Sequence, residues 1–304
     1  MDLAEAGKRL RGSIVPLVTP FDERGEIDRK CLQSLIDWQI AEGTHGISVT
    51  GTTGEPSSLS LEERELMISL AVEDTAGRVP VVVGSGTNNL KETLRLTAHA
   101  GRVGADAALV IVPYYNKPSQ EGLFQHFKAV AESTALPVII YNIPGRTAVN
   151  MNPETLARLR QACPNVIGVK EANVDLQQIS DELLLCGPDL LVYSGIEALC
   201  YPMLALGGAG HVSATANVAP KEVARLYDLT VEGRWEEARA LHYRLLPLNK
   251  ALFLETNPGP VKTAMGWLGL IHPALRLPLV PPSATNQAKL REAMEGLGLI
   301  ARAS

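Results

Sequence analysis

The stretch Val166-Ile167-Gly168-Val169-Lys170-Glu171 decides how the rest of the chain is interpreted. Apolar or small residues run without a break into a lysine, which predicts a strand buried on both faces with Lys170 at its carboxyl end. A lysine has an ordinary pKa of ~10.4, and burial lowers that pKa and frees the lone pair for attack on a carbonyl. Two interpretations are open: Lys170 reaches solvent or pairs with Glu171, or it is a Schiff-base nucleophile.

The composition is that of an ordinary globular protein. The 304 residues are 46% hydrophobic and 20% charged, with a formal net charge of -5 and no basic block. This charge disfavours a nucleic-acid or anionic-membrane partner, and no apolar run is long enough to span a bilayer. Residues 1–12 lack the apolar core of a secretion signal. The four scattered cysteines have no zinc or redox spacing and indicate buried thiols in a reducing cytoplasm: Cys31, Cys163, Cys186 and Cys200.

Strand-like apolar runs alternate with helical patterns along most of the chain. Helical spacing is clear at 28–41 and 90–103, and Ser60 with Glu63 forms a capping box at the start of another helix. Eight such units in series predict an α/β fold of the (β/α)8 TIM-barrel type. The predicted strands are 13–18, 46–50, 79–83, 108–112, 137–141, 166–170, 190–193 and, more weakly, 210–215.

The competing α/β architecture is a doubly wound sheet, which would carry fewer units and a glycine fingerprint after its first strand. Gly84-Ser85-Gly86 is followed by Thr87, so the G-x-G-x-x-G pattern fails, and no P-loop is present. We therefore expect a barrel over residues 1–220. Helical patterns fill residues 221–304 without linker composition, which predicts an extension packed on the barrel as one structural unit.

Polar residues gather at the predicted carboxyl ends of the strands, where active sites of such barrels lie. Each has a structural explanation on its own, because turn threonines bond their own backbone, strand-end tyrosines pack, and an arginine can be a surface charge. Their convergence on one rim favours function. No histidine, carboxylate pair or cysteine joins them, which disfavours a hydrolase triad and a metal site. The set is Thr52, Thr53, Tyr114, Tyr115, Tyr141, Arg146 and Lys170.

This set fits Schiff-base chemistry on an oxo acid. Lys170 would add to a ketone carbonyl, and the protonated imine would let the adjacent carbon lose a proton and become a nucleophilic enamine. A tyrosine hydroxyl can carry the protons, threonine hydroxyls can hold one carboxylate, and an arginine can hold a second. Because the imine itself withdraws the electrons, no further cofactor is expected.

The motifs resemble the 4-hydroxy-tetrahydrodipicolinate synthases, also called dihydrodipicolinate synthases, of the N-acetylneuraminate lyase superfamily. The likeness extends from Gly12 to Leu299 and includes Pro247 to Lys262. The lysine motif is shared by the superfamily, whereas the Gly-Thr-Thr-Gly-Glu, double-tyrosine and arginine motifs are more typical of the synthases. The segments are Gly-Ser-Ile-Val-Pro-Leu-Val-Thr-Pro-Phe (12–21), Gly-Thr-Thr-Gly-Glu (51–55), Pro-Tyr-Tyr-Asn-Lys-Pro (113–118), Tyr-Asn-Ile-Pro-Gly-Arg-Thr (141–147) and Gly-Val-Lys-Glu-Ala (168–172).

The resemblance implies a role for each matching catalytic residue. Lys170 is similar to the lysine that holds pyruvate as a Schiff base, and Tyr141 is similar to the general acid/base beside it. Thr52 and Tyr115 resemble the rest of the proton relay, with Tyr115 reaching in from a neighbouring subunit. The family also implies a homotetramer built as a dimer of dimers.

The resemblance likewise implies the substrate contacts. Thr53 is similar to the residue that binds the pyruvate carboxylate, and Arg146 to the one that meets the carboxylate of the incoming aldehyde. Gly195 and Val212 match positions that line the pocket through backbone groups. Glu197 is the candidate that would meet an amine on that aldehyde.

The implied reaction condenses pyruvate with aspartate semialdehyde to 4-hydroxy-tetrahydrodipicolinate, in lysine and diaminopimelate biosynthesis. Two segments depart from the family pattern, Ser194-Gly195-Ile196-Glu197 and Asn173-Val174-Asp175. Both lie on the aldehyde side and leave a second function open: a pyruvate aldolase acting on 2,4-dihydroxyhept-2-ene-1,7-dioate, which would give pyruvate and succinate semialdehyde. A non-catalytic binding barrel is a remote third possibility.

Some synthases of this family bind lysine as a feedback inhibitor, and three positions of that site match here, namely Asn88, Glu92 and Tyr114. Leu61 and Arg64, however, stand where two histidines are often found, and Pro56 replaces a small polar residue. An added cation and the loss of polar ligands predict weak or absent inhibition by lysine.

Overall fold

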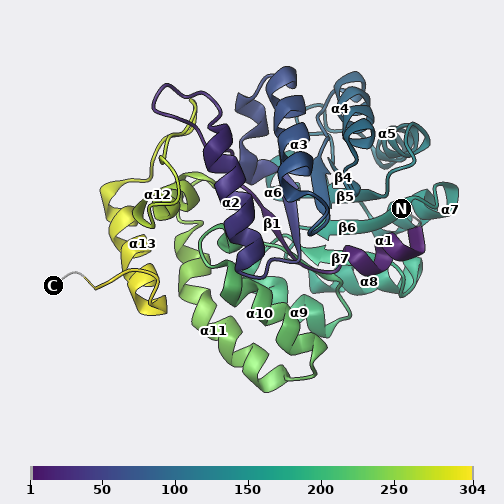
Figure 1. Cartoon of the computed structure of the whole chain (residues 1–304). Helices are drawn as coiled ribbons and strands as arrows, with labels where there is room; N and C mark the ends of the chain where they lie inside the picture. Colours follow the sequence, from purple (N-terminus) through teal and green to yellow (C-terminus); the bar gives the residue numbers. More distant parts are fainter. Residues whose placement is uncertain (1–2, 303–304) are drawn as a thin grey trace.

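The computed structural model describes residues 3–302, and its eight parallel strands close into a barrel surrounded by helices (Figure 1). β1 pairs with both β2 and β8, so the sheet has no free edge. This confirms the predicted (β/α)8 barrel. The strands are β1 (Gly12–Pro16), β2 (Gly46–Val49), β3 (Val81–Gly84), β4 (Ala107–Ile111), β5 (Val138–Asn142), β6 (Val166–Glu171), β7 (Leu191–Ser194) and β8 (Gly210–Val212).

Each strand is followed by a helix on the outside of the barrel. The predicted capping box is confirmed at α3, where Ser60 Oγ accepts from the Glu63 N–H at 3.1 Å and Glu63 Oε2 accepts from the Ser60 N–H at 2.8 Å. The outer helices are α2 (Arg29–Ala41), α3 (Leu61–Thr75), α4 (Leu90–Val103), α5 (Gln120–Glu132), α7 (Pro153–Ala162), α8 (Leu176–Cys186), α9 (Cys200–Ala205) and α10 (Pro220–Val231).

Three short helices were not predicted from the sequence: α1 (Leu3–Arg9), α6 (Pro144–Thr147) and α9. Each spans about two turns or fewer, which is too short for a helical period to appear in the pattern of apolar residues.

The helix α1 closes the barrel at the amino ends of the strands. Ala6 and Leu10 are fully buried in the cluster of side chains that fills the barrel, and the Tyr193 hydroxyl donates to the Leu10 carbonyl at 2.6 Å. Inward residues of the strands, among them Ile14 and Leu109, complete this cluster. Within residues 3–302 the barrel is therefore closed at the amino ends of its strands, which leaves the carboxyl ends for a ligand.

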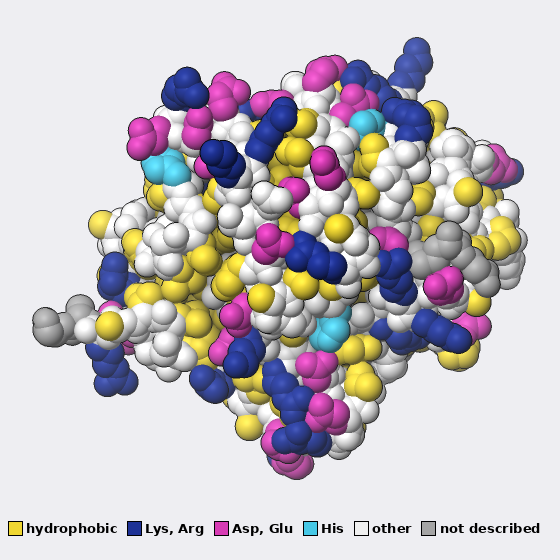
Figure 2. Space-filling view, viewed as in Figure 1, with side chains coloured by type: hydrophobic (Ala, Val, Ile, Leu, Met, Phe, Trp, Pro, Cys, Tyr) yellow, Lys and Arg dark blue, Asp and Glu magenta, His cyan; other side chains and the backbone are white. Residues whose placement is uncertain are grey.

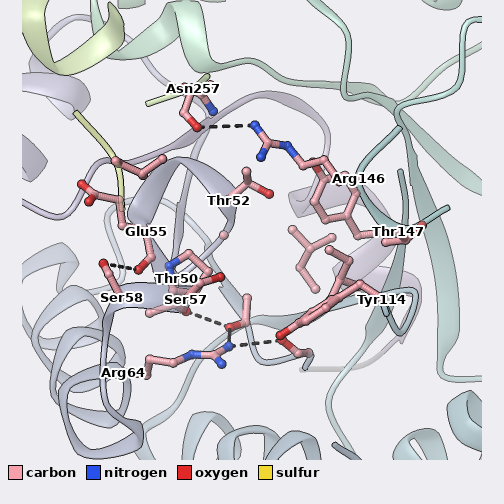
Figure 3. A pocket seen from close by; sticks show the side chains of 18 of the residues that line it. Thr50, Thr52, Glu55, Ser57, Ser58, Arg64, Tyr114, Arg146, Thr147 and Asn257 are labelled. Carbon is pink, nitrogen blue, oxygen red and sulfur yellow. Dashed lines mark hydrogen bonds between the residues drawn. The ribbon is translucent and has the colours of Figure 1, made fainter. Parts of the chain in front are cut away.

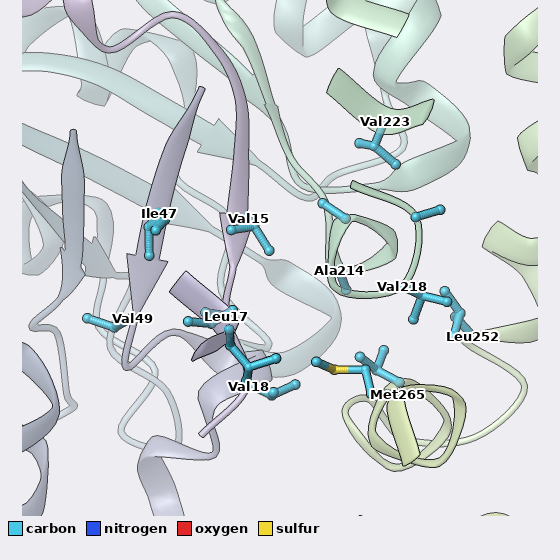
Figure 4. Close-up of a cluster of buried hydrophobic side chains, with 14 of the residues drawn as sticks. Val15, Leu17, Val18, Ile47, Val49, Ala214, Val218, Val223, Leu252 and Met265 are labelled. Atoms are coloured by element: carbon cyan, nitrogen blue, oxygen red, sulfur yellow. The ribbon is translucent and has the colours of Figure 1, made fainter. Parts of the chain in front are cut away.

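The extension consists of α11 (Trp235–Ala251), α12 (Gly259–Trp267) and α13 (Ala284–Leu297), while α10 follows β8 and packs against β1. The buried cluster outside the barrel contains residues of both parts (Figure 4): Val18 lies after β1, Val218 before α10, Leu252 after α11 and Met265 in α12. Because apolar burial supplies most of the folding free energy, we propose that the barrel and the extension fold as one structural unit.

A buried ion pair also joins the extension to the barrel. Lys262 of α12 and Glu55, just after β2, have fully buried side chains whose Nζ and Oε1 atoms lie 2.5 Å apart. Lys262 Nζ also donates to the Ala274 carbonyl at 2.9 Å and lies 4.1 Å from the centroid of the Phe21 ring. Burial lowers the pKa of Lys262 to about 8, against the opposing charge of Glu55. Removing either partner would leave a buried charge unpaired, which costs several kcal/mol.

Surface charges contribute less to the fold. Acidic and basic side chains are interspersed on the face shown in Figure 2, and several form exposed ion pairs, such as Arg225 with Glu232 and Arg234 with Glu237. Exposed pairs of this kind contribute roughly 0–1 kcal/mol each. None of the helices in the described part of the chain is long and apolar enough to cross a membrane.

Candidate active site

Lys170 of β6 and Tyr141 of β5 lie directly opposite each other at the open end of the barrel. The pairing register matches the two residues, and Lys170 Nζ lies 4.0 Å from the centroid of the Tyr141 ring. The Lys170 side chain is only 5% exposed, yet no carboxylate of the described residues forms an ion pair with it. A buried amine without a counter-ion is suited to react with a carbonyl.

The alternative in which Lys170 pairs with Glu171 is wrong, because successive residues of a strand point to opposite faces. Lys170 points into the barrel. Glu171 points outward against α8, where its Oε1 accepts from Asn142 Nδ2 at 2.8 Å. Asn142 is paired with Glu171 in the register, one residue beyond Tyr141.

Gly195, which follows β7, leaves room for the lysine. A Cβ atom at Gly195 would lie 2.9 Å from Lys170 Cε, closer than real Cβ contacts, and 3.1 Å from Ala172 Cβ, which is also tight. The Gly195 N–H donates to the Glu171 carbonyl at 2.6 Å, which fixes the loop at this distance. Val212 of β8 is buried among the side chains that fill the barrel. Both residues therefore lie within the barrel mouth.

Thr52 and Thr53 belong to a short 3-10 turn, Thr52–Gly54, directly after β2. Thr53 is buried, and its Oγ1 accepts a hydrogen bond from Asn257 Nδ2 at 3.0 Å. Asn257 lies between α11 and α12, and its carbonyl accepts from Arg146 Nη2 at 3.4 Å. Asn257 thus bridges Thr53 and Arg146, the two residues that are expected to hold the two carboxylates.

A cavity of about 310 Å³ opens above these residues (Figure 3). Four residues of the predicted rim set line it, namely Thr52, Tyr114, Tyr141 and Arg146. Lys170 lies against the Tyr141 ring rather than in the cavity wall, and Thr53, Gly195, Val212 and Glu197 are likewise outside the wall. Other lining residues are Ser57, Ser58, Arg64, Thr256 and Asn257.

The sequence profile of the Dihydrodipicolinate synthetase family matches residues 9–297. The chain belongs to the dihydrodipicolinate synthetase family. A curated relative, the 4-hydroxy-tetrahydrodipicolinate synthase of Thermodesulfovibrio yellowstonii, is 49% identical over 290 residues, which are 95% of this chain and 99% of that protein. This confirms the family resemblance of the five motifs.

Solved structures of the family have the same fold. The crystal structure of dihydrodipicolinate synthase from Aquifex aeolicus is 47% identical with a TM-score of 0.93, covering 95% of this chain and 98% of that one. The enzyme from Acinetobacter baumannii, crystallised in complex with pyruvate, is 40% identical with a TM-score of 0.93, covering 95% of this chain and 99% of that one.

In this member of the dihydrodipicolinate synthetase family, Tyr115 does not reach its own cavity. Its side chain is 89% exposed, whereas the adjacent Tyr114 lines the cavity wall. Tyr115 also has a positive φ of 72°, and Lys117 one of 46°. Such backbone conformations cost of order 1–3 kcal/mol in residues other than glycine. An exposed aromatic side chain on a strained turn points to a contact outside the chain.

Glu197 is buried in this member of the dihydrodipicolinate synthetase family. Its Oε1 accepts from the Ala214 N–H at 2.8 Å and from Ser213 Oγ at 3.4 Å. Burial raises the pKa of Glu197, and the hydrogen bond from Ala214 and the positive charge of Lys170 partly oppose that shift. Glu197 therefore lies close to Lys170, but its carboxylate is already bonded within the protein. To meet a substrate amine it would have to give up these bonds.

Several cavity residues were not predicted from the sequence, and Asn257 is the one among them that contacts two predicted residues; it lies far from any strand end. The only signal was that Pro247 to Lys262 shared in the family likeness. Among the described residues, no group of three histidine, cysteine, aspartate or glutamate side chains could hold a metal ion. In this dihydrodipicolinate synthetase family member, the chemistry at the rim is that of an amine, phenols, hydroxyls and a guanidinium.

Proposed function

We propose that this chain condenses pyruvate with aspartate semialdehyde to form 4-hydroxy-tetrahydrodipicolinate, through an imine at Lys170. The observation that carries the proposal is a buried lysine that forms no ion pair with any described residue and is held against the ring of Tyr141 at the open end of the barrel. The names of its curated relatives support this activity. The reaction belongs to the biosynthesis of lysine and diaminopimelate.

The reaction begins when Lys170 Nζ attacks C2 of pyruvate. Water leaves and a protonated imine forms, which draws electrons from the neighbouring C3. Two tyrosines are paired with Lys170 in the register, Tyr141 of β5 and Tyr193 of β7. The Tyr193 hydroxyl donates to the Leu10 carbonyl, so we assign the proton transfers of these steps to Tyr141. Loss of a proton from C3 gives the enamine. Because lysine and substrate together provide the electron sink, the reaction requires no separate cofactor.

The enamine carbon then attacks the aldehyde carbon, and the aldehyde oxygen takes a proton and becomes the 4-hydroxyl group. The amine that the aldehyde carries can add to the imine carbon and displace Lys170 Nζ, which closes a six-membered ring and frees the enzyme. Atoms balance without an oxidant or reductant, since only one water leaves per condensation cycle.

The two substrate carboxylates need separate partners. We assign the pyruvate carboxylate to Thr53 with the amides of the Thr52–Gly54 turn, because this turn lies directly after β2 at the open end of the barrel. We assign the aldehyde carboxylate to Arg146, which lines the cavity. A guanidinium holds a carboxylate through two parallel hydrogen bonds. Asn257 would keep both holders at a fixed separation.

We further propose that Tyr115 completes the site of a second copy of the chain. In its own chain the residue is exposed and turned away from the cavity, so it can take part in the relay with Thr52 and Tyr141 only across an interface. A dimer is the smallest assembly that meets this requirement, and a tetramer of two such dimers is the assembly we expect. The free state of the four cysteines fits a reducing cytoplasm.

A second function remains a specific alternative, because Glu197 is already hydrogen-bonded to Ala214 and is not in the cavity wall. If no carboxylate meets an amine, the site would suit succinate semialdehyde, and the enzyme would be a pyruvate aldolase acting on 2,4-dihydroxyhept-2-ene-1,7-dioate. A non-catalytic barrel is disfavoured by the joint presence of Lys170, Tyr141 and Arg146.

One experiment tests the imine. The protein is incubated with pyruvate and borohydride, and mass spectrometry locates the label. We expect a reduced pyruvyl group on Lys170 and none in Lys170→Ala. Tyr141→Phe should lower turnover by about two to four orders of magnitude, the usual contribution of a positioned acid/base. Label on another lysine, or no label, would refute the mechanism. Comparing kcat/KM for aspartate semialdehyde and succinate semialdehyde identifies the second substrate.

A further inference from the structure

The turn that we assign to the pyruvate carboxylate, Thr52–Gly54, lies between two residues with strained backbone conformations. Thr50 has a φ of 55° and Glu55 a φ of 54°, both in the left-handed region that residues other than glycine rarely adopt. The Glu55 N–H donates to the Thr52 carbonyl at 3.2 Å, so the strained residue is also the end of the turn. Conformations of this kind persist only where the surrounding structure holds them in place.

Hydrogen bonds from the barrel hold the first part of this loop. The Thr50 hydroxyl donates to the Gly84 carbonyl at 2.9 Å, and the Thr19 hydroxyl donates to the Gly54 carbonyl at 2.7 Å. Gly84 ends β3 and Thr19 follows β1, so both partners belong to the strands on either side of β2. These bonds fix the backbone of the loop as far as Gly54, and the residue that follows is held differently.

Glu55 is held by the extension. Its side chain is fully buried, and its Oε1 lies 2.5 Å from Lys262 Nζ and has no other partner among the described residues. Its Oε2 accepts from the Arg276 N–H at 3.3 Å. Lys262 Nζ is itself fixed, because it donates to the Ala274 carbonyl at 2.9 Å. Since water does not compete at a buried site, this ion pair is a firm connection between the loop and the extension.

The same segment of the extension reaches the turn at a second point. Asn257 lies shortly before Lys262 in the sequence, and its Nδ2 donates to Thr53 Oγ1 at 3.0 Å. Asn257 and Glu55 both line the cavity (Figure 3). Only Gly54 separates Thr53 from Glu55 in the chain. A change in the ion pair would therefore move the Thr53 hydroxyl and the amides of the turn together.

We propose that Glu55 and Lys262 are positioning residues whose buried ion pair determines the affinity of the site for pyruvate. Neither side chain has exposed surface, so the pair acts on the substrate only through the Thr52–Gly54 turn. This inference rests on the proposed function, because it concerns the carboxylate that we assign to this turn. An ion pair that only stabilised the fold would leave the affinity for pyruvate unchanged, and the two roles can therefore be separated by measurement.

Isothermal titration calorimetry with pyruvate on the intact protein tests this role. In Glu55→Gln the apparent Kd for pyruvate should rise about tenfold, the effect of losing one charge-assisted hydrogen bond. In steady-state assays KM for pyruvate should rise with it, whereas kcat should stay nearly unchanged, because Lys170 and Tyr141 keep their own contacts. Borohydride should still label Lys170 at saturating pyruvate.

Leu290→Ala is the matched control. Leu290 is fully buried in α13 of the same extension and belongs to its apolar cluster. Its truncation should lower the temperature of thermal unfolding by leaving a cavity, while the Kd for pyruvate stays at the wild-type value. If Glu55→Gln does not fold, the double variant Glu55→Gln/Lys262→Met replaces it, because no buried charge is then left unpaired. The double variant should show the same rise in Kd.

Two results would overturn the positioning role and leave the proposed function intact. One is an unchanged Kd for pyruvate in the folded Glu55 variants, and the other is an equal rise in Leu290→Ala. If the wild-type protein neither binds pyruvate nor becomes labelled on Lys170, the proposed function itself is wrong, and the positioning role is refuted with it.

Discussion

Glu171 and Asn142 face each other on the outside of the barrel, one residue beyond Lys170 and Tyr141, the proposed catalytic pair, on the same two strands. Gln178 of α8 connects this pair to a second buried acid, since its Nε2 donates to Glu171 Oε1 at 3.5 Å and to Glu182 Oε1 at 3.2 Å. Burial and the neighbouring Glu182 raise the pKa of Glu171 well above its ordinary value. Burial also raises the pKa of Glu182 to about 7. Two buried carboxyl groups therefore lie behind the strand ends that carry the proposed catalytic residues.

We predict that Glu182→Gln flattens the pH dependence of stability. A carboxyl group whose folded pKa is raised stabilises the fold fully below its unfolded pKa, and that stabilisation is lost as pH rises through the folded pKa. For Glu182 the window runs from 4.5 to about 7. The wild type should lose up to about 3 kcal/mol across it, at ~1.36 kcal/mol per unit.

Urea denaturation at pH 5, 6, 7 and 8 measures this effect. Glu154→Gln, the same substitution at an exposed carboxylate of α7, is the control and should keep the wild-type profile. Parallel profiles for the wild type and Glu182→Gln would contradict the prediction.

In kinetic assays Glu171→Gln should change kcat more than KM, because Glu171 positions the strand end and touches no substrate.

We predict that Tyr115 acts in the partner's site. Tyr115→Phe should lower turnover clearly, though by less than Tyr141→Phe. Hybrids of a Tyr115→Phe chain with a Lys170→Ala chain should regain part of the activity, since one site of such a dimer has an intact lysine and receives an intact Tyr115. Separately tagged chains allow the hybrids to be purified and assayed. Verified hybrids that remain inactive would place Tyr115 in the relay of its own chain, against its exposure.

Arg146→Ala should lower kcat/KM for an acidic aldehyde by about two orders of magnitude, because it removes a charge-assisted bond worth ~2–4 kcal/mol. Borohydride trapping of pyruvate on Lys170 should survive, because we assign the pyruvate carboxylate to Thr53. Loss of trapping in Arg146→Ala with unchanged aldehyde affinity would reverse the two assignments.

Glu197→Gln distinguishes the two candidate reactions. If Glu197 leaves Ala214 to meet a substrate amine, the substitution should reduce kcat/KM for aspartate semialdehyde more than for succinate semialdehyde. An equal reduction would mean that Glu197 acts only within the protein, near Lys170, and would favour the aldolase alternative. Steady-state assays with both aldehydes decide between these outcomes.

L-Lysine at millimolar concentration should inhibit the enzyme little or not at all. The buried guanidinium of Arg64 repels the ammonium groups of lysine, and Leu61 and Pro56 offer no polar side-chain partner. Initial rates with increasing L-lysine at fixed pyruvate measure the inhibition. A sub-millimolar inhibition constant would show that lysine finds a site away from Arg64.

The strands and most helices were predictable because each repeats a strong local pattern: an apolar run, a polar loop and an amphipathic helix. The grouping of the predicted rim residues followed from the topology, since the carboxyl ends of all strands of a parallel barrel lie on the same side. Asn257 could not be predicted, because its position depends on how the extension folds back over the barrel. The exposure of Tyr115 also could not be predicted. Tyr114 and Tyr115 are adjacent, and only the conformation of the turn between β4 and α5 decides which of them faces the cavity.

Asn257 and Lys262 come from the extension, yet one touches Thr53 and the other neutralises Glu55 on the same loop after β2. Anyone who recombines this enzyme with a relative should therefore not place a crossover between residues 56 and 257 without checking both contacts. In a chimera that takes the loop from one parent and the extension from another, each segment can keep the structure of its own parent while the contacts between the two segments are lost. Thr53 and Arg146, the proposed carboxylate-binding residues, would then be displaced. The loop after β2 and the segment that contains Asn257 should therefore be exchanged together, although they lie some 200 residues apart in the sequence.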